Sequence, residues 1–409
     1  MLDTVIIGAG FAGLSAARTL MNEGRGNFVV LEARDRVGGR TKAGKIGDIS
    51  VDLGGMWMAP TQTRLKSLAA HYNVQAYPTY LDGNAIFRIG TRERQGPRED
   101  PSRLLGIAGG LAYLFAKWKL ERPMARLDNN QPWAHPQAKE LDATTVETWI
   151  ARNVYHPLAR AAFRTICNSL LCAEPSQVSL LFFLHYVKSG GGLDVLISAD
   201  AGGAQNLMFH GGVHQISRLH LNAPVMVIEW HDRGVTVHSE VGTFSARSAI
   251  IAISPTLMHR ITFLPTLPQP KVAVHEHLFM GSSIKFWVLY KTPFWREMGL
   301  NGTILRDDTA ITPVMDVSPP DQKNGLLVGF FDANRAINNA DLSVEGRRAI
   351  VLEMLVEHFG PDASEPLDYV DHDWTDEVWS GGCYGAYAPP GVFTPYGQTL
   401  RATIGPLHW

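Results

Sequence analysis

The sequence opens with Asp3-Thr-Val-Ile-Ile-Gly-Ala-Gly-Phe-Ala-Gly13 and, after an alanine-rich segment, continues with Val29-Val-Leu-Glu-Ala-Arg-Asp-Arg-Val-Gly-Gly-Arg40. The short apolar run at Thr4–Ile7 ends at a glycine, which is typical of a strand buried on both faces of a parallel sheet. Leu14–Asn22 is expected to form a helix and Phe28–Leu31 a second parallel strand. These forty residues therefore predict an α/β fold.

Three glycines between the first strand and the helix have the spacing of a dinucleotide-binding loop. Gly8 permits the tight turn, Gly10 lets the backbone approach a pyrophosphate, and Gly13 lets the helix pack on the strand. Glu32 follows the second strand, where a carboxylate can bind the hydroxyls of a ribose. Three glycines alone would be weak support, but the complete arrangement predicts dinucleotide binding.

Two further glycine pairs indicate which dinucleotide is bound. Gly38-Gly39 precedes Arg40, and Gly54-Gly55 lies within Val51-Asp-Leu-Gly-Gly-Met-Trp57. Such pairs let the chain approach a bulky planar group, and the arginine can neutralise pyrophosphate charge. A nicotinamide site needs neither feature, and ordinary turns are the alternative.

With these segments the sequence resembles the flavin-containing amine oxidase family, of the monoamine oxidase type. The resemblance implies a Rossmann-like, glutathione-reductase-like FAD-binding domain with an inserted α+β substrate domain. It places the FAD-binding domain at residues 1–76, 206–258 and 375–409, and the substrate domain at 77–205 and 259–374.

The same resemblance implies which residues hold FAD, with Val225 meeting its adenine end through the backbone. The expected contacts are Gly8, Gly10, Phe11, Ala12, Gly13, Glu32, Ala33, Arg34, Gly38, Gly39, Arg40, Gly54, Gly55, Met56, Trp57, Val225, Trp379, Cys383 and Tyr384. For Trp57, core packing is an equal alternative.

Lys285 is the first residue expected to take part in the chemistry. Gly281-Ser-Ser-Ile-Lys-Phe-Trp-Val-Leu-Tyr290 reads as a strand with one cation among apolar residues. A lysine is rarely buried without a partner, so Lys285 either faces solvent or meets a group that offsets its desolvation. In the resembled family this lysine holds a water against flavin N5.

The segment Trp379-Ser-Gly-Gly-Cys-Tyr-Gly-Ala-Tyr-Ala-Pro-Pro-Gly391 is the most specific motif near the end of the sequence. Its glycine pair lets the backbone pass close to a planar ring. The resemblance implies a thioether from Cys383 to the flavin 8α carbon, the alternative being a buried free thiol. It also makes Tyr384 one wall of an aromatic cage.

An aromatic, dry cleft suits amine oxidation, because desolvation favours the neutral amine while ring faces orient it. The resemblance places substrate contacts at Leu171, Ile197 and Gln205, although core packing is an alternative for each. The expected function is FAD-dependent oxidation of a primary or secondary amine to an imine and aldehyde, with O2 reduced to H2O2. The alternatives are a polyamine or L-amino-acid oxidase, or an inactive FAD-binding partner protein. Neither an arginine clamp nor acidic channel residues can be identified.

The composition of the 409 residues indicates which classes of binding partner to expect. Charged residues make up 19% and the formal net charge is -2, which argues against nucleic acid. Three cysteines form no disulfide framework, Cys167 and Cys172 reading as core thiols, so a cytoplasmic location is expected. No apolar stretch reaches the roughly 20 residues of a membrane span. The expected partners are a small amine and O2, with a homodimer as a further option.

No metal is expected. His275 and His277 alternate on an expected strand, and His210 and His214 are four residues apart, but neither pair has a third ligand. Two intervals depart from the resembled family. Only residues 213–221 are available for a crossover helix, and relatives continue beyond Trp409 with more of the FAD site.

Overall fold

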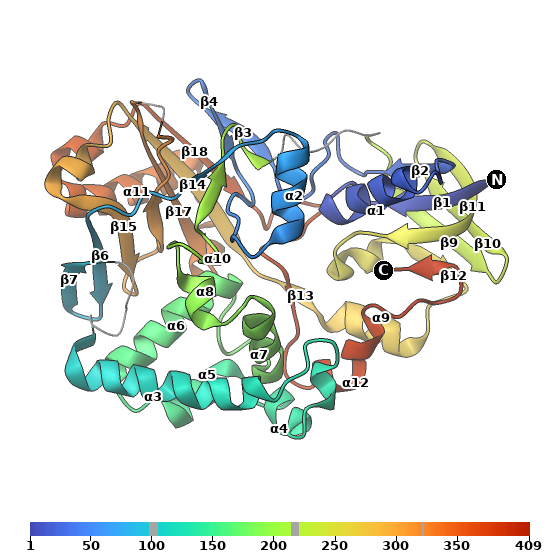
Figure 1. The fold of residues 1–409 in the computed structure, drawn as a ribbon, viewed down its shortest axis with the longest axis horizontal. Helices are drawn as coiled ribbons and strands as arrows, with labels where there is room; N and C mark the ends of the chain where they lie inside the picture. Colours follow the sequence, from blue (N-terminus) through green and yellow to red (C-terminus); the bar gives the residue numbers. More distant parts are fainter. Residues whose placement is uncertain (98–104, 214–220, 321–322) are drawn as a thin grey trace.

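The computed structural model describes residues 1–97, 105–213, 221–320 and 323–409. Within these residues, two seven-stranded sheets and a layer of helices make up most of the molecule (Figure 1). Both termini lie at the first sheet, while the helical layer extends below the second sheet in Figure 1. The expected α/β class is confirmed.

The first sheet has the strand order β12-β9-β10-β11-β1-β2, with β20 paired to β11. β1 (Leu2–Ile7) pairs in parallel with β2 (Phe28–Leu31) and β11 (Gly242–Ile251). The interior of β1 is solvent-inaccessible, as expected for a parallel strand covered on both faces. The adjoining helix α1 (Phe11–Asn22) begins three residues before the expected start, because the extended Gly10 is already its N-cap.

The first sheet is assembled from distant parts of the chain. Its remaining strands are β9 (Val225–His231), β10 (Gly234–Ser239), β12 (Thr262–Leu264) and β20 (Leu407–His408). β9 and β10 form a hairpin, and β12 pairs in parallel with β9. The sheet therefore extends past residue 258, where the expected second segment ended.

The second sheet has the order β18-β14-β17-β16-β15-β6-β7. Its strands are β6 (Asn84–Ile89), β7 (Arg92–Gly96), β14 (Ser283–Tyr290), β15 (Leu300–Arg306), β16 (Val314–Asp316), β17 (Gly325–Asp332) and β18 (Asp368–Asp373). β14 is buried along its whole length between β17 and β18, which confirms the strand predicted around Lys285. In this register Lys285 is opposite Phe330, and Ser283 is opposite Asp332.

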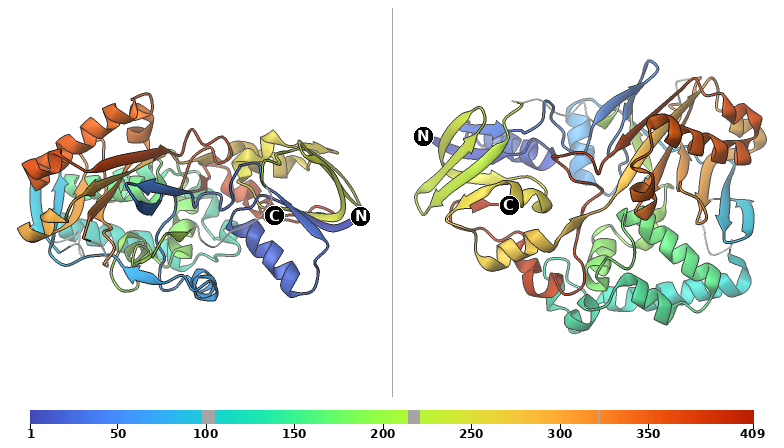
Figure 2. Two further views of the ribbon diagram at one scale, coloured as in Figure 1. Left: turned by 90° about the horizontal axis from the view of Figure 1, so that it is seen from above. Right: turned by 180° about the vertical axis from the view of Figure 1, so that it is seen from behind.

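Helices cover the second sheet. α11 (Val344–Phe359) packs its buried face on Phe286 and Val288, and Figure 2 shows it along the outside of the sheet. The helical layer consists of α3 (Gly106–Ala125), α4 (Ala138–Asp142), α5 (Val146–Asn153), α6 (Pro157–Leu171), α7 (Leu180–Ser189) and α8 (Leu193–Ile197). These helices share one apolar core.

The segment around His275 is helical, which corrects the expectation of a strand. α9 (Gln269–His277) has Pro270 in its first turn, and His277 Nδ1 lies 2.7 Å from the Ala273 carbonyl, one turn away. Only the two histidines alternate, whereas Lys271, Val274 and His275 are buried at positions i, i+3 and i+4, which fits a helix face.

The smaller elements complete the fold. They include β3 (Ala43–Ile46), β4 (Ile49–Asp52), α2 (Thr63–His71), β5 (Ala76–Pro78), β8 (Leu207–Phe209), β13 (Phe279–Met280), α10 (Asn334–Asn339), β19 (Ala386–Tyr387) and α12 (Phe393–Tyr396). Residues 213–221 are the short interval that the sequence leaves for a crossover helix, and most of them are outside the described residues. In the part of the chain that is described, no helix has both the length and the apolar character to cross a membrane.

Candidate active site

The glycine loop after β1 leaves open space at one of its three glycines. A Cβ at Gly8 would lie 2.8 Å from the Ala252 carbonyl oxygen, and one at Gly13 would lie 1.9 Å from the Gly8 carbonyl oxygen. A Cβ at Gly10 would meet nothing closer than the Gly39 Cα at 3.9 Å. A side chain at Gly8 or Gly13 would therefore clash with the protein backbone, whereas Gly10 faces open space in which a ligand could lie.

The N-terminal end of α1 is suited to an anion. Its N-cap, Gly10, has no side chain to accept hydrogen bonds from Phe11, Ala12 or Gly13. Such free amides, together with the helix dipole, favour phosphate. Gly38 holds the next glycine pair against this loop by donating its amide to the Ala9 carbonyl at 2.9 Å.

Glu32 is buried at the end of β2, with 3% of its surface exposed. Its Oε2 accepts a hydrogen bond from the Ala9 amide at 2.7 Å, and its Oε1 accepts one from the Arg34 amide at 3.1 Å. The turn through Ala33 is tied to the segment before β9, because the Ala223 amide donates to the Glu32 carbonyl at 2.7 Å. Glu32, Ala33, Arg34 and the start of β9 at Val225 therefore lie together, beside the glycine loop.

Arg40 brings a positive charge to the same region. Its guanidinium donates to the Tyr384 carbonyl, and among the described residues no carboxylate forms an ion pair with it. Although much of the side chain is open to the central cavity, the surrounding protein lowers its pKa by desolvation. A guanidinium that lines a cavity and has no ion-pair partner fits a pyrophosphate. Gly10, Glu32 and Arg40 together therefore fit FAD.

A cavity of about 730 Å³ continues from Arg40 into the space between the second sheet and the helical layer. Residues expected at the FAD or substrate site line it, namely Arg40, Gly54, Gly55, Met56, Trp57, Ile197, Gln205, Lys285, Cys383 and Tyr384. The Arg40 region, the Lys285 strand and the Cys383-Tyr384 motif thus meet in one cavity.

Aromatic rings form much of the cavity wall. The Phe330 ring lies 6.1 Å from the Trp57 ring and 6.3 Å from the Tyr384 ring, which it meets at 90°. Tyr384 is 40% exposed, and it lines the cavity. Trp57 Nε1 is buried with no partner among the described residues, so a polar group could bind there. The sequence did not indicate Phe330, because a phenylalanine in a buried strand is ordinarily core.

Lys285 is buried against the cavity, with 2% of its surface exposed. Its Nζ donates to the carbonyls of Asp52 and Gly54, both at 2.7 Å, and contacts the Met56 sulfur at 3.2 Å. Burial lowers its pKa to about 7. A thioether accepts hydrogen bonds only weakly, so a water could take the place of Met56 as the third partner.

Charged side chains also line the cavity, and the sequence did not reveal them. They are Lys117, Asp194, Asp200 and Arg306. Lys117 pairs with Asp194, and Asp200 Oδ2 accepts a hydrogen bond from the Ser198 hydroxyl at 3.2 Å. The two aspartates correct the expectation that acidic residues are absent along the channel. They lie in a loop and a short helix, where an aspartate is usually solvated.

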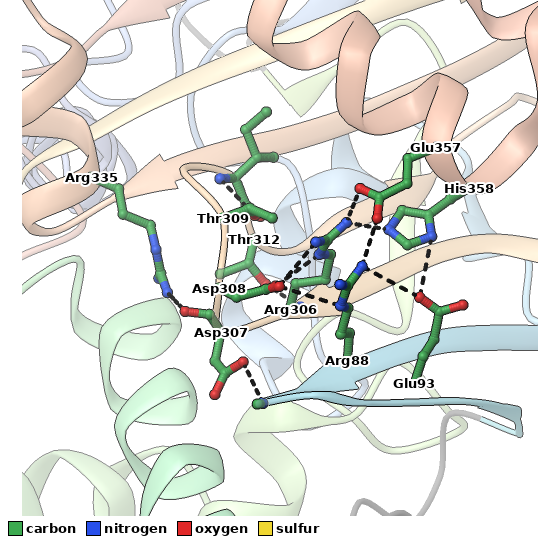
Figure 3. A network of polar contacts seen from close by, with 12 residues as sticks. Arg88, Glu93, Arg306, Asp307, Asp308, Thr309, Thr312, Arg335, Glu357 and His358 are labelled. Atoms are coloured by element: carbon green, nitrogen blue, oxygen red, sulfur yellow. Dashed lines mark hydrogen bonds and ion pairs between the residues drawn. The ribbon is translucent and has the colours of Figure 1, made fainter.

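Arg306 is already neutralised by a polar network (Figure 3). Its Nε and Nη2 donate to the two oxygens of Asp308 at 2.9 and 3.1 Å. Its Nη1 donates to Glu357 and lies 2.7 Å from His358 Nε2. With its donors committed, Arg306 is poorly placed to clamp a substrate carboxylate.

Leu171, an expected substrate contact, and Trp379, an expected FAD contact, both lie outside the cavity lining. Leu171 is fully buried in the helical core, and its neighbour Leu170 lines the cavity instead. Near the C-terminal end of α6, Leu170 lines the cavity and Leu171 packs in the helical core. The family pattern did not show which of these two neighbours would reach the cavity. Trp379 lies under the Arg260 guanidinium, 5.4 Å from its ring centre. Across the described ranges, no cluster of His, Cys, Asp or Glu could hold a metal; His214 is outside them.

Comparison with known sequences agrees with this geometry. Residues 11–409 match the family model for flavin containing amine oxidoreductase. The chain is 34% identical to the probable flavin-containing monoamine oxidase A of Dictyostelium discoideum, over 100% of this chain and 91% of that protein.

Solved structures of similar shape include two amine oxidases. The cyclohexylamine oxidase from Brevibacterium oxydans IH-35A superposes with a TM-score of 0.93 at 31% identity, covering 100% of this chain and 92% of that one. A wild-type putrescine oxidase bound to putrescine also superposes with a TM-score of 0.93. It is 30% identical, and the match covers 100% of this chain and 92% of that one.

Proposed function

The chain belongs to the family of flavin-containing amine oxidoreductases, and we propose that its substrates are primary or secondary amines that carry a single apolar group. Its cofactor is FAD, and its reaction is the oxidative deamination of an amine. When bound, FAD accepts a hydride from the α carbon of the amine and passes the two electrons to O2, which gives H2O2.

The proposed FAD site combines the first sheet with the cavity. The α1 N-terminus and Arg40 would hold the pyrophosphate, Glu32 the ribose, and Val225 the adenine end. Gly54 and Gly55 border the cavity where the ring system would lie, opposite the Cys383-Tyr384 motif. On this basis the first sheet forms the core of the FAD-binding domain.

The cavity walls prepare the amine for oxidation. Trp57, Phe330 and Tyr384 give it an apolar lining, which disfavours the ammonium form and so raises the fraction of neutral amine. The ring faces still attract the nitrogen and orient it. Lys285 is proposed to hold a water at the edge of the flavin, since Met56 can yield its place around Nζ.

The observation that carries this substrate class is the state of Arg306. An amino-acid oxidase needs a cation to bind the substrate carboxylate, and here the only arginine besides Arg40 among the described cavity-lining residues is saturated by Asp308 and Glu357. A carboxylate in the cavity would therefore remain desolvated without a partner.

Two matched pairs of amines test this proposal. 2-Phenylethylamine and L-phenylalanine differ by one carboxylate, and 1-aminobutane and 1,4-diaminobutane differ by one distal amine. We expect kcat/KM for peroxide formation to be at least about 10-fold higher for the first member of each pair, because an extra charge is costly in an apolar cavity. A preference for L-phenylalanine would overturn the proposal.

A diamine is the second candidate substrate, because Asp200 and Asp194 line the cavity. Asp194 is already paired with Lys117, which leaves Asp200 as the carboxylate best placed for a distal ammonium. If 1,4-diaminobutane is preferred and Asp200→Asn removes the preference, while Asp194→Asn keeps it, the diamine class is correct.

Cys383 is proposed to bond to the 8α carbon of the flavin. It lines the cavity next to Tyr384, whose carbonyl accepts a hydrogen bond from Arg40. Acid precipitation tests this bond directly, since a linked flavin stays with the precipitated protein. Complete release of yellow colour into the supernatant would show that Cys383 is unlinked.

An inactive FAD-binding protein is the rival to an enzyme. The yellow protein should bleach when 2-phenylethylamine is added without O2, and air should restore the colour with formation of peroxide. Protein that binds FAD but does not bleach with any of the four amines would support the rival.

A further inference from the structure

A buried polar cluster lies directly beneath the Cys383 motif. Cys172 caps the C-terminal end of α6, Ser283 begins β14, and Asp332 ends β17. Asp332 Oδ1 accepts a hydrogen bond from the Ser283 hydroxyl at 2.7 Å and another from the Cys172 thiol at 3.3 Å. At 0% exposure, Asp332 is a carboxylate enclosed by protein.

The Cys172 thiol connects this carboxylate to Cys383. Burial, and after it the neighbouring Cys383 side chain, raise the pKa of the Cys172 thiol, so the two side chains are neighbours. Gly281 lets their backbones meet, because a Cβ there would lie 2.5 Å from the Cys383 carbonyl oxygen and 2.8 Å from the Cys172 carbonyl oxygen. The Cys383 amide donates to Gly281 at 2.9 Å, and the Ser282 amide donates to Cys172 at 2.7 Å. The Cys172 thiol therefore contacts Asp332, and Cys172 lies beside Cys383 where both backbones meet Gly281.

The charge environment of Asp332 suits proton acceptance. Burial raises its pKa to about 7, whereas the hydrogen bonds from Ser283 and Cys172 and the charge of Arg335 act in the opposite direction. Its Oδ2 is buried and has no hydrogen-bond partner among the described residues. The ionisable groups around it are Cys172, Cys383, Tyr384 and Arg335. The difference in pKa between a thiol and such a carboxylate is smaller than that between a thiol and an ordinary aspartate, so proton transfer to Asp332 is easier.

We propose that Asp332, acting through Cys172, accepts the thiol proton of Cys383 when Cys383 forms its bond to the flavin. This inference rests on the thioether proposed above. The thiol and the 8α methyl group each lose one hydrogen, a carbon–sulfur bond forms, and O2 takes up two electrons and two protons to leave as H2O2. Asp332 is thus a positioning residue for the linking thiol, because it is fully buried and does not line the cavity.

The test follows the covalent fraction over time in full-length protein that has bound FAD. The variants Asp332→Asn and Cys172→Ala are compared with wild type by acid precipitation at about pH 7 and about pH 9. Asparagine keeps an acceptor for Ser283 and Cys172, so the fold is disturbed little. Cys167→Ala is the matched control, because Cys167 is buried on the same helix and has no described contact with Asp332.

Both test variants should link FAD at least about 10-fold more slowly than wild type at pH 7. In Asp332→Asn the deficit should shrink at pH 9, where hydroxide offers another acceptor for the thiol proton; a purely structural defect would not recover with pH. Cys167→Ala should link at the wild-type rate, and all variants should remain yellow before acid treatment.

The outcomes separate this inference from the proposal on which it rests. If Asp332→Asn and Cys172→Ala link as fast as wild type while Cys383→Ala does not link, Asp332 is not the acceptor and the thioether stands. If wild type releases all its flavin in acid, both the thioether and the role of Asp332 are wrong, although amine oxidation is unaffected. If Asp332→Asn does not fold, the rate for Cys172→Ala decides.

Discussion

Two buried lysines in different regions of this molecule have nearly the same surroundings. Lys285 and Lys271 are 2% and 1% exposed, and each donates two hydrogen bonds to backbone carbonyls, at 2.7 and 2.7 Å and at 2.7 and 3.0 Å. Each lies over a tryptophan, Trp287 at 4.9 Å and Trp409 at 3.5 Å. Burial lowers the pKa of Lys285 to about 7 and that of Lys271 to about 8.

The two lysines differ in the segments whose carbonyls accept their hydrogen bonds. The carbonyls bound by Lys285 belong to Asp52 and Gly54, and its side chain lines the cavity. Those bound by Lys271 belong to the segment after α12, which is thereby tied to α9. Burial and a lowered pKa therefore do not identify a catalytic lysine by themselves. Contact with the cavity is the additional requirement.

The largest expected effect is the loss of activity in Lys285→Met. Without its ammonium group the loop at Asp52–Gly54 loses two hydrogen bonds, and a displacement of about 1 Å next to a reacting group can cost about 100-fold in rate. We therefore expect kcat/KM for peroxide formation to fall about 100-fold, with FAD still bound.

Lys271→Met is the matched control for that experiment, because it removes an equally buried lysine outside the cavity. Its kcat/KM should remain within about twofold of wild type. Similar losses in the two variants would break the distinction between the two lysines and point to a general defect in folding.

The second effect is on stability and concerns Lys271→Met. The carbonyls of Thr399 and Leu400 would lose their donor, and an unsatisfied buried acceptor costs about 1–3 kcal/mol. We expect the free energy of unfolding, measured in urea, to decrease by about 2 kcal/mol. An increase instead would mean that desolvation of the lysine outweighs its contacts.

The third effect is a pH dependence that differs between the two lysines. In the unfolded chain a lysine titrates near 10.4, whereas in the folded chain Lys285 titrates at about 7. The unfolded chain therefore binds more protons between these values, and stability relative to Lys285→Met rises with pH there, by at most about 1.4 kcal/mol per unit.

The free energy of unfolding relative to Lys271→Met should show the same rise with pH. The rise should start about one pH unit higher, because the pKa of Lys271 in the folded chain is about 8. The neighbouring His275, whose pKa burial lowers to about 4, does not titrate in this range. Urea unfolding at about pH 6, 8 and 9 measures both curves against the methionine variants. Wild-type and variant curves that run parallel would contradict the lowered pKa values.

The same contrast explains how far the sequence could predict the molecule. The β1–α1–β2 unit and the Lys285 strand were predictable because glycine positions and apolar runs are local signals. Lys285 stood out as a cation among eight buried strand residues. Lys271 gave no such signal, since a lysine near the start of a helix is usually solvated.

The rest of the site depends on contacts between distant residues. Asp332 and Cys172 are 160 residues apart, and only pairing of β14 with β17 brings Ser283 to the same place. An aspartate after an apolar run commonly marks the end of a strand, so nothing in the sequence indicated a buried carboxylate. The helix at His275 was missed for a related reason, since a short apolar segment fits either period.

The smallest expected effect is the coupling between the two lysines. They share no described hydrogen-bond partner, and their tryptophan neighbours Trp287 and Trp409 pack in separate apolar clusters. Mutations at independent sites add to within about 0.5 kcal/mol, so Lys285→Met combined with Lys271→Met should lose the sum of the two single losses in unfolding free energy. The four proteins, unfolded in urea at one pH, complete the cycle. A coupling above about 1 kcal/mol would mean that the cavity and the segment after α12 act as one unit, and the activity of Lys285→Met would then depend partly on the region that Lys271 holds.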